Sequence, residues 1–241
     1  MTVALIMAGG RSERMRRSGN PCHKALRQVH GVCLLERNIQ YAIGSGIDRI
    51  FVATNRNEPS IISFVQQRAR SIAKEQGADV FCLLEDEPLG TIGIAQQLAH
   101  LRESVVALNV DNLTTIDLEQ MIAMRDANDA SLCIATHVEG FQVPLGQVVS
   151  RQGQIVEYRE KPTMRVRVSS GAYVLAPRVC DWIQPGRKTD LPELIPMAHS
   201  RGEQVASYEH EAPWIDINDA DALVRAETLI EQSMSKVVRP R

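Results

Sequence analysis

A glycine pair followed closely by an arginine is the first group of residues in this chain that could do chemistry. Gly9, Gly10 and Arg14 come soon after a short apolar run at residues 3–6. Glycine lets the backbone turn tightly and bring its N–H groups close to a ligand, and arginine offers a planar set of donors to phosphate oxygens. The spacing therefore predicts a phosphate-binding loop at the end of a buried strand. A strand-to-helix turn that needs glycine only for its shape would give the same pattern.

Charged side chains at strand ends or among apolar neighbours are the next candidates. Lys24 follows the glycine loop, Asp111 ends an apolar run, Asp216 stands among apolar residues, and Glu160 adjoins Lys161. An isolated lysine is usually solvent-exposed, a strand-end aspartate serves turns as well as metals, and most adjacent ion pairs are surface features. A carboxylate among apolar neighbours is harder to explain without a partner. For each of these residues, a functional role and a purely structural or surface role are both possible, and the position of the residue in the fold distinguishes them.

Composition argues against several classes of protein. The chain has 241 residues, of which 44% are apolar and 23% are charged, with a net charge of −2. These values are ordinary for a globular protein and give no general attraction to nucleic acid. No apolar run approaches the ~18 residues of a membrane-spanning helix, and the apolar residues 3–7 are too few for a secretory leader. The five cysteines are widely spaced without a Cys-x-x-Cys pair, which argues against disulfides and zinc, so we expect a reduced, cytoplasmic protein.

The elements that must position these residues alternate between strand and helix in the first half of the chain. Strand-like apolar runs occur at residues 3–6, 49–53, 79–83, 105–108 and 131–135. Helical apolar spacing occurs at residues 34–43, 61–73, 92–101 and 118–124. This alternation predicts an α/β fold with a mostly parallel sheet that helices cover on both faces. Ligands bind such sheets beyond the carboxyl ends of the strands, so we expect the glycine loop and Asp111 to face one crevice.

The second half of the chain has more strands and fewer helices. Residues 154–158, 166–175 and 204–208 are strand-like, and helices are expected from about residue 191 and over residues 219–231. No repeat or linker marks a second domain, so we expect residues 1–234 to form a single domain. Residues 235–241 form a basic tail that we expect to be disordered.

Eight short segments, in this order, resemble the signature motifs of the sugar-phosphate nucleotidylyltransferase family, also called sugar-nucleotide pyrophosphorylases. They are residues 7–15 (MAGGRSERM), 24–26 (KAL), 89–93 (LGTIG), 109–111 (NVD), 144–146 (PLG), 160–162 (EKP), 170–175 (SGAYVL) and 214–217 (WIDI). The chain departs from the family's pattern where Ser12 replaces a loop glycine and where Cys22 and His23 separate Pro21 from Lys24. The resemblance implies a Rossmann-like, mixed but mostly parallel sheet flanked by helices on both faces, and we expect no C-terminal β-helix.

The reaction implied by the resemblance is attack of a sugar 1-phosphate on the α-phosphorus of a nucleoside triphosphate, which yields a nucleotide sugar and pyrophosphate. The resemblance implies that the nucleotide is bound by Ala8, Gly9, Gly10, Arg14, Leu89, Gly90 and Thr91. It implies that the sugar phosphate is bound by Gly146, Glu160, Lys161, Ser170 and Gly171. Arg14, Lys24 and Asp111 take the catalytic positions. Asp111 and Asp216 take the positions that hold Mg²⁺, a cation that prefers oxygen ligands.

The resemblance also suggests which nucleotide base and which acceptor phosphate the protein uses. Residues 87–91 (EPLGT) look most like family members that make GDP-mannose or GDP-heptose, which favours GTP as the donor. The acceptor would be a sugar 1-phosphate or a cyclitol 1-phosphate, with no nucleic-acid or membrane partner and with a homodimer as one assembly to test. Two alternatives stay open: a nucleotidyltransferase for a non-sugar phosphate or phosphonate, and a non-catalytic homologue that binds nucleotide sugars.

Overall fold

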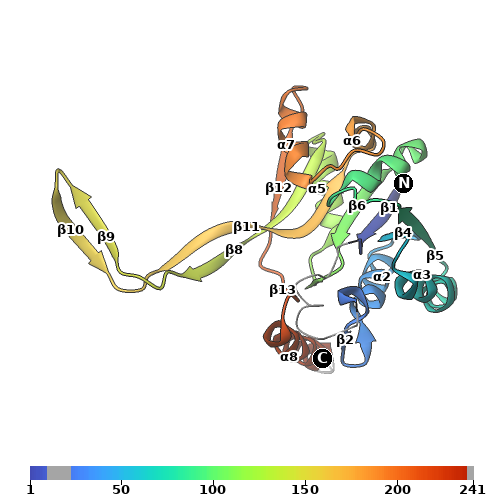
Figure 1. Cartoon of the computed structure of the whole chain (residues 1–241), viewed down its shortest axis with the longest axis horizontal. Helices are drawn as coiled ribbons and strands as arrows, with labels where there is room; N and C mark the ends of the chain where they lie inside the picture. The colour runs from blue at the N-terminus through green and yellow to red at the C-terminus, as the bar shows by residue number, and fades with distance from the viewer. Residues whose placement is uncertain (10–22, 238–241) are drawn as a thin grey trace.

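A seven-stranded sheet in the order β12-β8-β11-β6-β1-β4-β5 runs through the centre of the molecule (Figure 1). The computed structural model describes residues 1–9 and 23–237. The sheet strands are β1 (Thr2–Met7), β4 (Arg49–Asn55), β5 (Asp79–Glu85), β6 (Ser104–Asn109), β8 (Leu132–Gln142), β11 (Thr163–Leu175) and β12 (Val205–Glu209). β11 is antiparallel to both of its neighbours, β6 and β8, whereas the other neighbouring strands are parallel. The prediction of a mixed, mostly parallel sheet is confirmed.

Helices cover both faces of this sheet because its central strands are apolar on both sides. In β1, Ala4 and Ile6 belong to one buried cluster, whereas Val3 and Leu5 belong to another. The first cluster includes residues of α2 (Leu34–Gly44), α3 (Pro59–Phe64), the π-helix η2 (Val65–Ala69), α4 (Arg70–Glu75) and α5 (Leu118–Ala127). The second includes residues of the 3₁₀ helix η3 (Gly93–Leu101), α6 (Pro177–Trp182) and α7 (Leu191–His199). Strands buried on both faces are typical of parallel sheets that lie between helices.

Short strands bring distant parts of the chain together near the carboxyl end of β6. β13 (Trp214–Asp216) pairs antiparallel with β7 (Asn112–Thr114). The hairpin of β2 (Gln28–Val29) and β3 (Val32–Cys33) follows the 3₁₀ turn η1 (Lys24–Leu26). The last helix, α8 (Ala220–Val237), extends into the segment expected to be a disordered tail, and residues 238–241 lie outside the described part of the chain.

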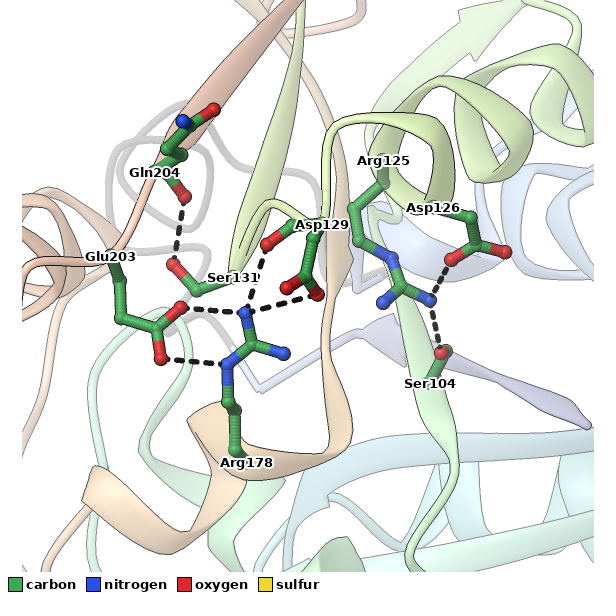
Figure 2. A network of polar contacts seen from close by, with 8 residues as sticks. All are labelled: Ser104, Arg125, Asp126, Asp129, Ser131, Arg178, Glu203 and Gln204. Atoms are coloured by element: carbon green, nitrogen blue, oxygen red, sulfur yellow. Dashed lines mark hydrogen bonds and ion pairs between the residues drawn. The ribbon is translucent and has the colours of Figure 1, made fainter.

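A network of polar contacts joins the segments that precede β8 and β12, at the amino end of these strands (Figure 2). The guanidinium of Arg178, on α6, donates to the carboxylate of Glu203 at 2.8 and 2.6 Å and to the carbonyl of Asp129 at 3.0 Å. The hydroxyl of Ser131 donates to the carbonyl of Gln204 at 2.9 Å. These contacts hold the start of β8 beside the start of β12. This end of the sheet is structural, and the cavity described below lies at the opposite end.

β8 and β11 continue beyond the sheet as a two-stranded ribbon that projects from the body (Figure 1). A hairpin of β9 (Gln147–Arg151) and β10 (Gln154–Arg159) forms its tip. We call residues 138–168 the arm, and none of them is buried. The strand predicted at residues 131–135 therefore starts in the sheet and runs on into the arm as far as Gln142.

The cysteines of the described residues are free thiols: Cys33, Cys82, Cys133 and Cys180. Burial raises the pKa of Cys180 to about 12 and that of Cys133 to about 11, so neither is a reactive thiolate at neutral pH. Within the described residues, no helix has both the length and the apolar character that crossing a membrane requires.

Candidate active site

A cavity of about 340 Å³ lies where β1, β4, β5 and β6 end. It is lined by Met7, Gly9, Lys24, Ala53, Glu85, Pro88, Gly90, Thr91, Ile94, Asn109, Asp111, Lys188 and Asp190. Parallel strands end at one edge of a sheet, which explains why residues far apart in the sequence meet here. Gly9, Lys24, Gly90, Thr91 and Asp111 are among the residues predicted from the sequence, and the structure brings them together.

Lys24 and Asp111, which both line the cavity, form an ion pair. Lys24 Nζ lies 2.5 Å from Asp111 Oδ2, and both side chains are largely buried, at 23% and 13% exposure. Lys24 begins η1, whose N-cap His23 accepts a hydrogen bond from the Ala25 backbone N–H at 3.1 Å. Asp111 follows β6 directly. A cation and a carboxylate in contact can both exchange partners when a phosphate and a metal ion enter the site.

Asp216 approaches Asp111 from the other end of the chain. Asp216 stands opposite Asn112 in the β13–β7 pair, and the backbone N–H of Ile217 donates to the carbonyl of Asp111 at 2.9 Å. Burial, followed by the negative charge of Asp111, raises the pKa of Asp216. Its Oδ1 is buried and has no hydrogen-bond partner among the described residues, whereas Oδ2 accepts from Asn218 at 2.5 Å. Two close carboxylates with one unpartnered oxygen fit a divalent cation that prefers oxygen ligands.

The segment around Gly90 and Thr91 is bound to the start of α7. The Thr91 backbone N–H donates to Asp190 Oδ1 at 2.9 Å, and its hydroxyl oxygen accepts from the Leu191 backbone N–H at 2.8 Å. Gly90 has a φ of +81°, and a Cβ there would lie 2.5 Å from the carbonyl oxygen of Thr189. Glycine is therefore required at position 90 by both the backbone conformation and the close approach. This contact fixes one wall of the cavity.

Glu85, which the sequence analysis missed, lines the cavity at the end of β5. Its side chain is almost fully buried, at 4% exposure, and a Cβ on Gly9 would lie 2.7 Å from Glu85 Oε2. Burial raises the pKa of Glu85, and a backbone hydrogen bond at Leu89 partly opposes this shift. Asp111 was found because it ends an apolar run. Glu85 also follows an apolar run, but it begins a run of three acidic residues, and the sequence does not show which of them is buried. Asn109, Lys188 and Asp190 were also missed.

Ser170 and Gly171 lie next to the cavity and are held by polar contacts. The carbonyl of Ser170 accepts from Asn112 Nδ2 at 2.8 Å and from Trp214 Nε1 at 2.7 Å. The Ser170 hydroxyl lies 2.8 Å from His137 Nδ1 and 2.7 Å from His210 Nε2. Ser170 is fully buried, and its hydroxyl contacts the rings of these two histidines.

Three residues expected to bind the sugar phosphate lie on the arm and do not line the cavity: Gly146, Glu160 and Lys161. The Tyr158 hydroxyl donates to Glu160 Oε2 at 3.0 Å, and a Cβ on Gly146 would collide with the Tyr158 hydroxyl. Two nucleotide-loop residues, Gly10 and Arg14, lie outside the described residues. Ala8 is buried in the core, and Leu89 adjoins the cavity without lining it.

Comparison with known proteins places this geometry in context. A family model described as "Nucleotidyl transferase" matches residues 3–233. A probable mannose-1-phosphate guanylyltransferase 2 of Arabidopsis thaliana is 25% identical over 97% of this chain and 66% of its own length. A mannose-1-phosphate guanyltransferase of Yarrowia lipolytica is 25% identical over 96% of this chain and 65% of its own length. The chain thus spans slightly less than two thirds of these relatives.

Solved structures share the fold at lower identity. A putative glucose-1-phosphate thymidylyltransferase from Bacillus anthracis superposes with a TM-score of 0.73, at 17% identity and 95% coverage of both chains. HddC from Yersinia pseudotuberculosis superposes with a TM-score of 0.71, at 20% identity, covering 95% of this chain and 100% of HddC.

Proposed function

This chain belongs to the nucleotidyl transferase family, and from this premise we propose that it joins GTP to a sugar 1-phosphate or a cyclitol 1-phosphate. An oxygen of the acceptor phosphate forms a bond to the α-phosphorus while the bond from that phosphorus to the bridging oxygen breaks. Pyrophosphate leaves, and the GMP unit stays on the acceptor phosphate as a GDP-linked sugar or cyclitol. The observation that carries this proposal is the Lys24–Asp111 ion pair inside a strand-end cavity that Gly9 also lines.

Glu85 supports guanine as the base. An ionised carboxylate only accepts hydrogen bonds, and it can accept two at once. The guanine edge offers an N1–H and an exocyclic amino group side by side, whereas the corresponding edge of adenine offers one donor and one acceptor. The carboxylate of Glu85 lies beside Gly9 in the cavity lining, and we propose that the base binds there. The two relatives described above are guanylyltransferases by name, which favours the same base.

Charge neutralisation and positioning are the main needs of this transfer, since the phosphate nucleophile is already ionised at neutral pH. Lys24 and Lys188 line the cavity and would contact phosphate oxygens. Arg14 would stabilise the charge that develops on the leaving pyrophosphate. Asp111 and Asp216 would hold Mg²⁺, which neutralises phosphate charge and polarises a phosphoryl oxygen when bound. Gly171, next to Asn109, would leave room for the acceptor.

The test is a pyrophosphate-release assay of GTP, ATP, CTP, UTP and dTTP with Mg²⁺, against a panel of sugar 1-phosphates, cyclitol 1-phosphates, phosphonates and alcohol phosphates. We expect release with GTP and a sugar 1-phosphate or cyclitol 1-phosphate, and little release with Asp111→Asn. Release only with phosphonates or alcohol phosphates would identify a non-sugar acceptor. Nucleotide binding without release on any acceptor would identify a non-catalytic homologue and overturn the proposal.

A further inference from the structure

The arm exposes most of the large apolar side chains that lie on the surface of the described residues. Nine of them are 41–71% exposed: Val138, Phe141, Leu145, Val148, Ile155, Val156, Tyr158, Met164 and Val166. Outside the arm, the described residues of this kind are Met1, Phe81, Met124 and Val224. Monomers rarely gather so many exposed large apolar residues on one segment, and large exposed apolar patches usually mark an interaction site.

Strand register gathers apolar residues on one face of the ribbon. Phe141 stands opposite Met164, and Glu139 stands opposite Val166. Side chains of paired residues project to the same side, and alternate residues share a face. The other face carries Arg165 and Arg167, together with the exposed side chain of Val138. An isolated two-stranded ribbon is only marginally stable in water, so an apolar face of this kind needs a cover.

The charges of the arm indicate what covers it. Residues 138–168 contain five basic and three acidic side chains, whereas the whole chain has a net charge of −2, so the rest of the chain is acidic. The cavity itself is lined by three carboxylates, Glu85, Asp111 and Asp190, and by two lysines. The arm thus carries a net positive charge and the rest of the chain a net negative charge, so the arm of one copy is attracted to the body of a second copy.

Glu160 and Lys161 directly follow the hairpin at the tip of the arm and lie outside the cavity lining. Tyr158 donates to Glu160 at 3.0 Å, so the carboxylate of Glu160 is held in place beside Lys161. Lys161 has a φ of +42°, a backbone conformation that costs a non-glycine residue energy and is often kept at ligand sites. The tip lies apart from β1, β4, β5 and β6, which border the cavity of the same copy (Figure 1).

We propose that the chain acts as a two-fold dimer in which the arm of each copy lies across the other copy and delivers Lys161 and Glu160 to that copy's cavity. There the lysine binds the acceptor phosphate and the glutamate accepts hydrogen bonds from acceptor hydroxyls. The acceptor chemistry rests on the proposed function, whereas the exchange of arms rests on the exposure, register and charge of the arm. Each cavity is then complete only in the dimer.

Paired heterodimers test whether the site is shared. Lys161→Ala and Asp111→Asn are co-expressed with different tags, and the heterodimer is purified through both tags. We expect about half of the wild-type turnover per dimer, because one of the two composite sites is intact. The control joins a wild-type copy to a copy that carries both changes, and it should be nearly inactive because each of its sites has one defect. The reverse pattern, in which only the control is active, would overturn the proposal.

The oligomeric state tests arm docking without relying on catalysis. We expect a dimer by light scattering for the wild type and a monomer for the double variant Phe141→Ser, Met164→Ser. Val224→Ser, which removes a comparably exposed apolar side chain outside the arm, should remain a dimer. These positions are exposed, so the variants should fold, which far-ultraviolet circular dichroism checks. A monomeric wild type would overturn the proposal.

A carbodiimide cross-link separates failure of this inference from failure of the proposed function. The reagent couples a lysine amine to a carboxylate that it touches, and Lys161 should couple to a cavity carboxylate of the other copy. We expect a dimer-sized band on a denaturing gel, with the linked peptides identified by mass spectrometry, and its loss in Lys161→Ala. A protein that forms this link but transfers no nucleotide would refute the proposed function and uphold arm exchange. An active protein without the link would do the opposite.

Discussion

Two carboxylates lie in surroundings that disfavour their charge: Glu85, which lines the cavity, and Asp216, which lies beside Asp111. Burial and the charge of Asp111 raise the pKa of Asp216, and burial raises the pKa of Glu85. An uncompensated buried charge costs stability, so a folded protein keeps such a group where a ligand or partner compensates it. For Asp216 we expect a divalent cation, and for Glu85 the two N–H donors of a base.

Glu85→Gln separates binding from stability. Loss of the charged acceptor should raise the KM for GTP about tenfold or more, since a hydrogen bond to a charged group contributes about 1.5–3 kcal/mol. In the ligand-free protein, the same change should raise the free energy of unfolding at neutral pH. Burial raises the pKa of Glu85 in the folded state, so its ionised form opposes folding above that pKa. The gain from glutamine should disappear at acidic pH, where the carboxyl is protonated in both the folded and unfolded states.

Steady-state kinetics and thermal unfolding at neutral and acidic pH measure both effects. Asp86→Asn is the control, because Asp86 is exposed and pairs with Arg56 away from the cavity lining. It should leave both the KM and the stability nearly unchanged. An unchanged KM for GTP in Glu85→Gln would contradict the assignment of Glu85 to the base.

Asp111→Asn should lower turnover by ~10² or more, even at raised Mg²⁺, because it removes one proposed cation ligand and an ion-pair partner of Lys24. A chelator should abolish the activity of the wild type. The control is Asp79→Asn, an exposed position at the amino end of β5. Pyrophosphate release that persists in chelator would show that the protein's own cations suffice.

At the residue scale, the sequence predicted the carboxylates that have no acidic neighbour in the sequence. It missed Glu85, which lies in a run of three acidic residues. Asp111 and Asp216 each interrupt an apolar context. Glu85 begins an acidic run, and a charge pattern does not reveal which member of the run is buried. In the fold, Asp86 and Glu87 are exposed and only Glu85 turns inward.

At the element scale, the sequence predicted strands best where both faces are covered. The runs at residues 3–6 and 105–108 lie within β1 and β6, because a doubly covered strand is continuously apolar. The arm was predicted only as separate strands. Alternation shows which residues share a face, but it does not show whether that face meets a helix or another molecule.

Helix capping gives a prediction about α7 and the cavity wall. Asp190 forms a capping box with Glu193 at the start of α7 and also accepts from Thr91, whereas Asp117 caps α5 away from the cavity. Asp190→Ala and Asp117→Ala should each cost about 1 kcal/mol of unfolding free energy. Only Asp190→Ala should also raise the KM for the nucleotide, because only this change releases the Gly90–Thr91 segment. Urea unfolding and kinetics decide, and equal effects on KM would contradict the assignment.

The turn at Gly171 gives a second prediction at this scale. Gly171 and Gly202 have the same φ of +71°, but a Cβ on Gly171 would collide with Asn112, whereas one on Gly202 would meet nothing within 4 Å. Gly202→Ala should therefore cost about 1 kcal/mol for the backbone alone. Gly171→Ala should cost about 2–4 kcal/mol, because the collision adds to this strain. Equal losses in urea unfolding would show that the space around Gly171 adjusts.

At the scale of the whole molecule, the sequence predicted the sheet edge but not the completed acceptor site. Gly9, Lys24, Thr91 and Asp111 could be predicted to meet because every parallel strand delivers its carboxyl end to one edge. Lys161 could not be placed in the same way. Its position depends on how the arm leaves the sheet and on what the arm contacts. The spacing of apolar residues along the sequence predicts neither of these.

Replacing residues 140–165 by Asn-Gly should leave a folded body. None of the removed side chains is buried, so the two apolar clusters on the faces of the sheet keep their members. We expect a cooperative thermal transition within a few degrees of the wild type, since a loss of 1 kcal/mol shifts Tm by roughly 2–4 °C in a chain of this size. GTP binding, measured by calorimetry, should remain, while transfer to the acceptor should be lost. A broad transition would show that the arm supports the body.

The separation of arm and core also bears on how such a protein diverges. Substitutions at residues 138–168 leave the buried clusters untouched, so the arm can accumulate changes with little loss of foldability. The cavity, by contrast, is built from strand ends whose neighbours are core residues. Acceptor preference can therefore drift over generations while base preference stays fixed, and related copies that exchange arms could acquire a new acceptor through assembly alone.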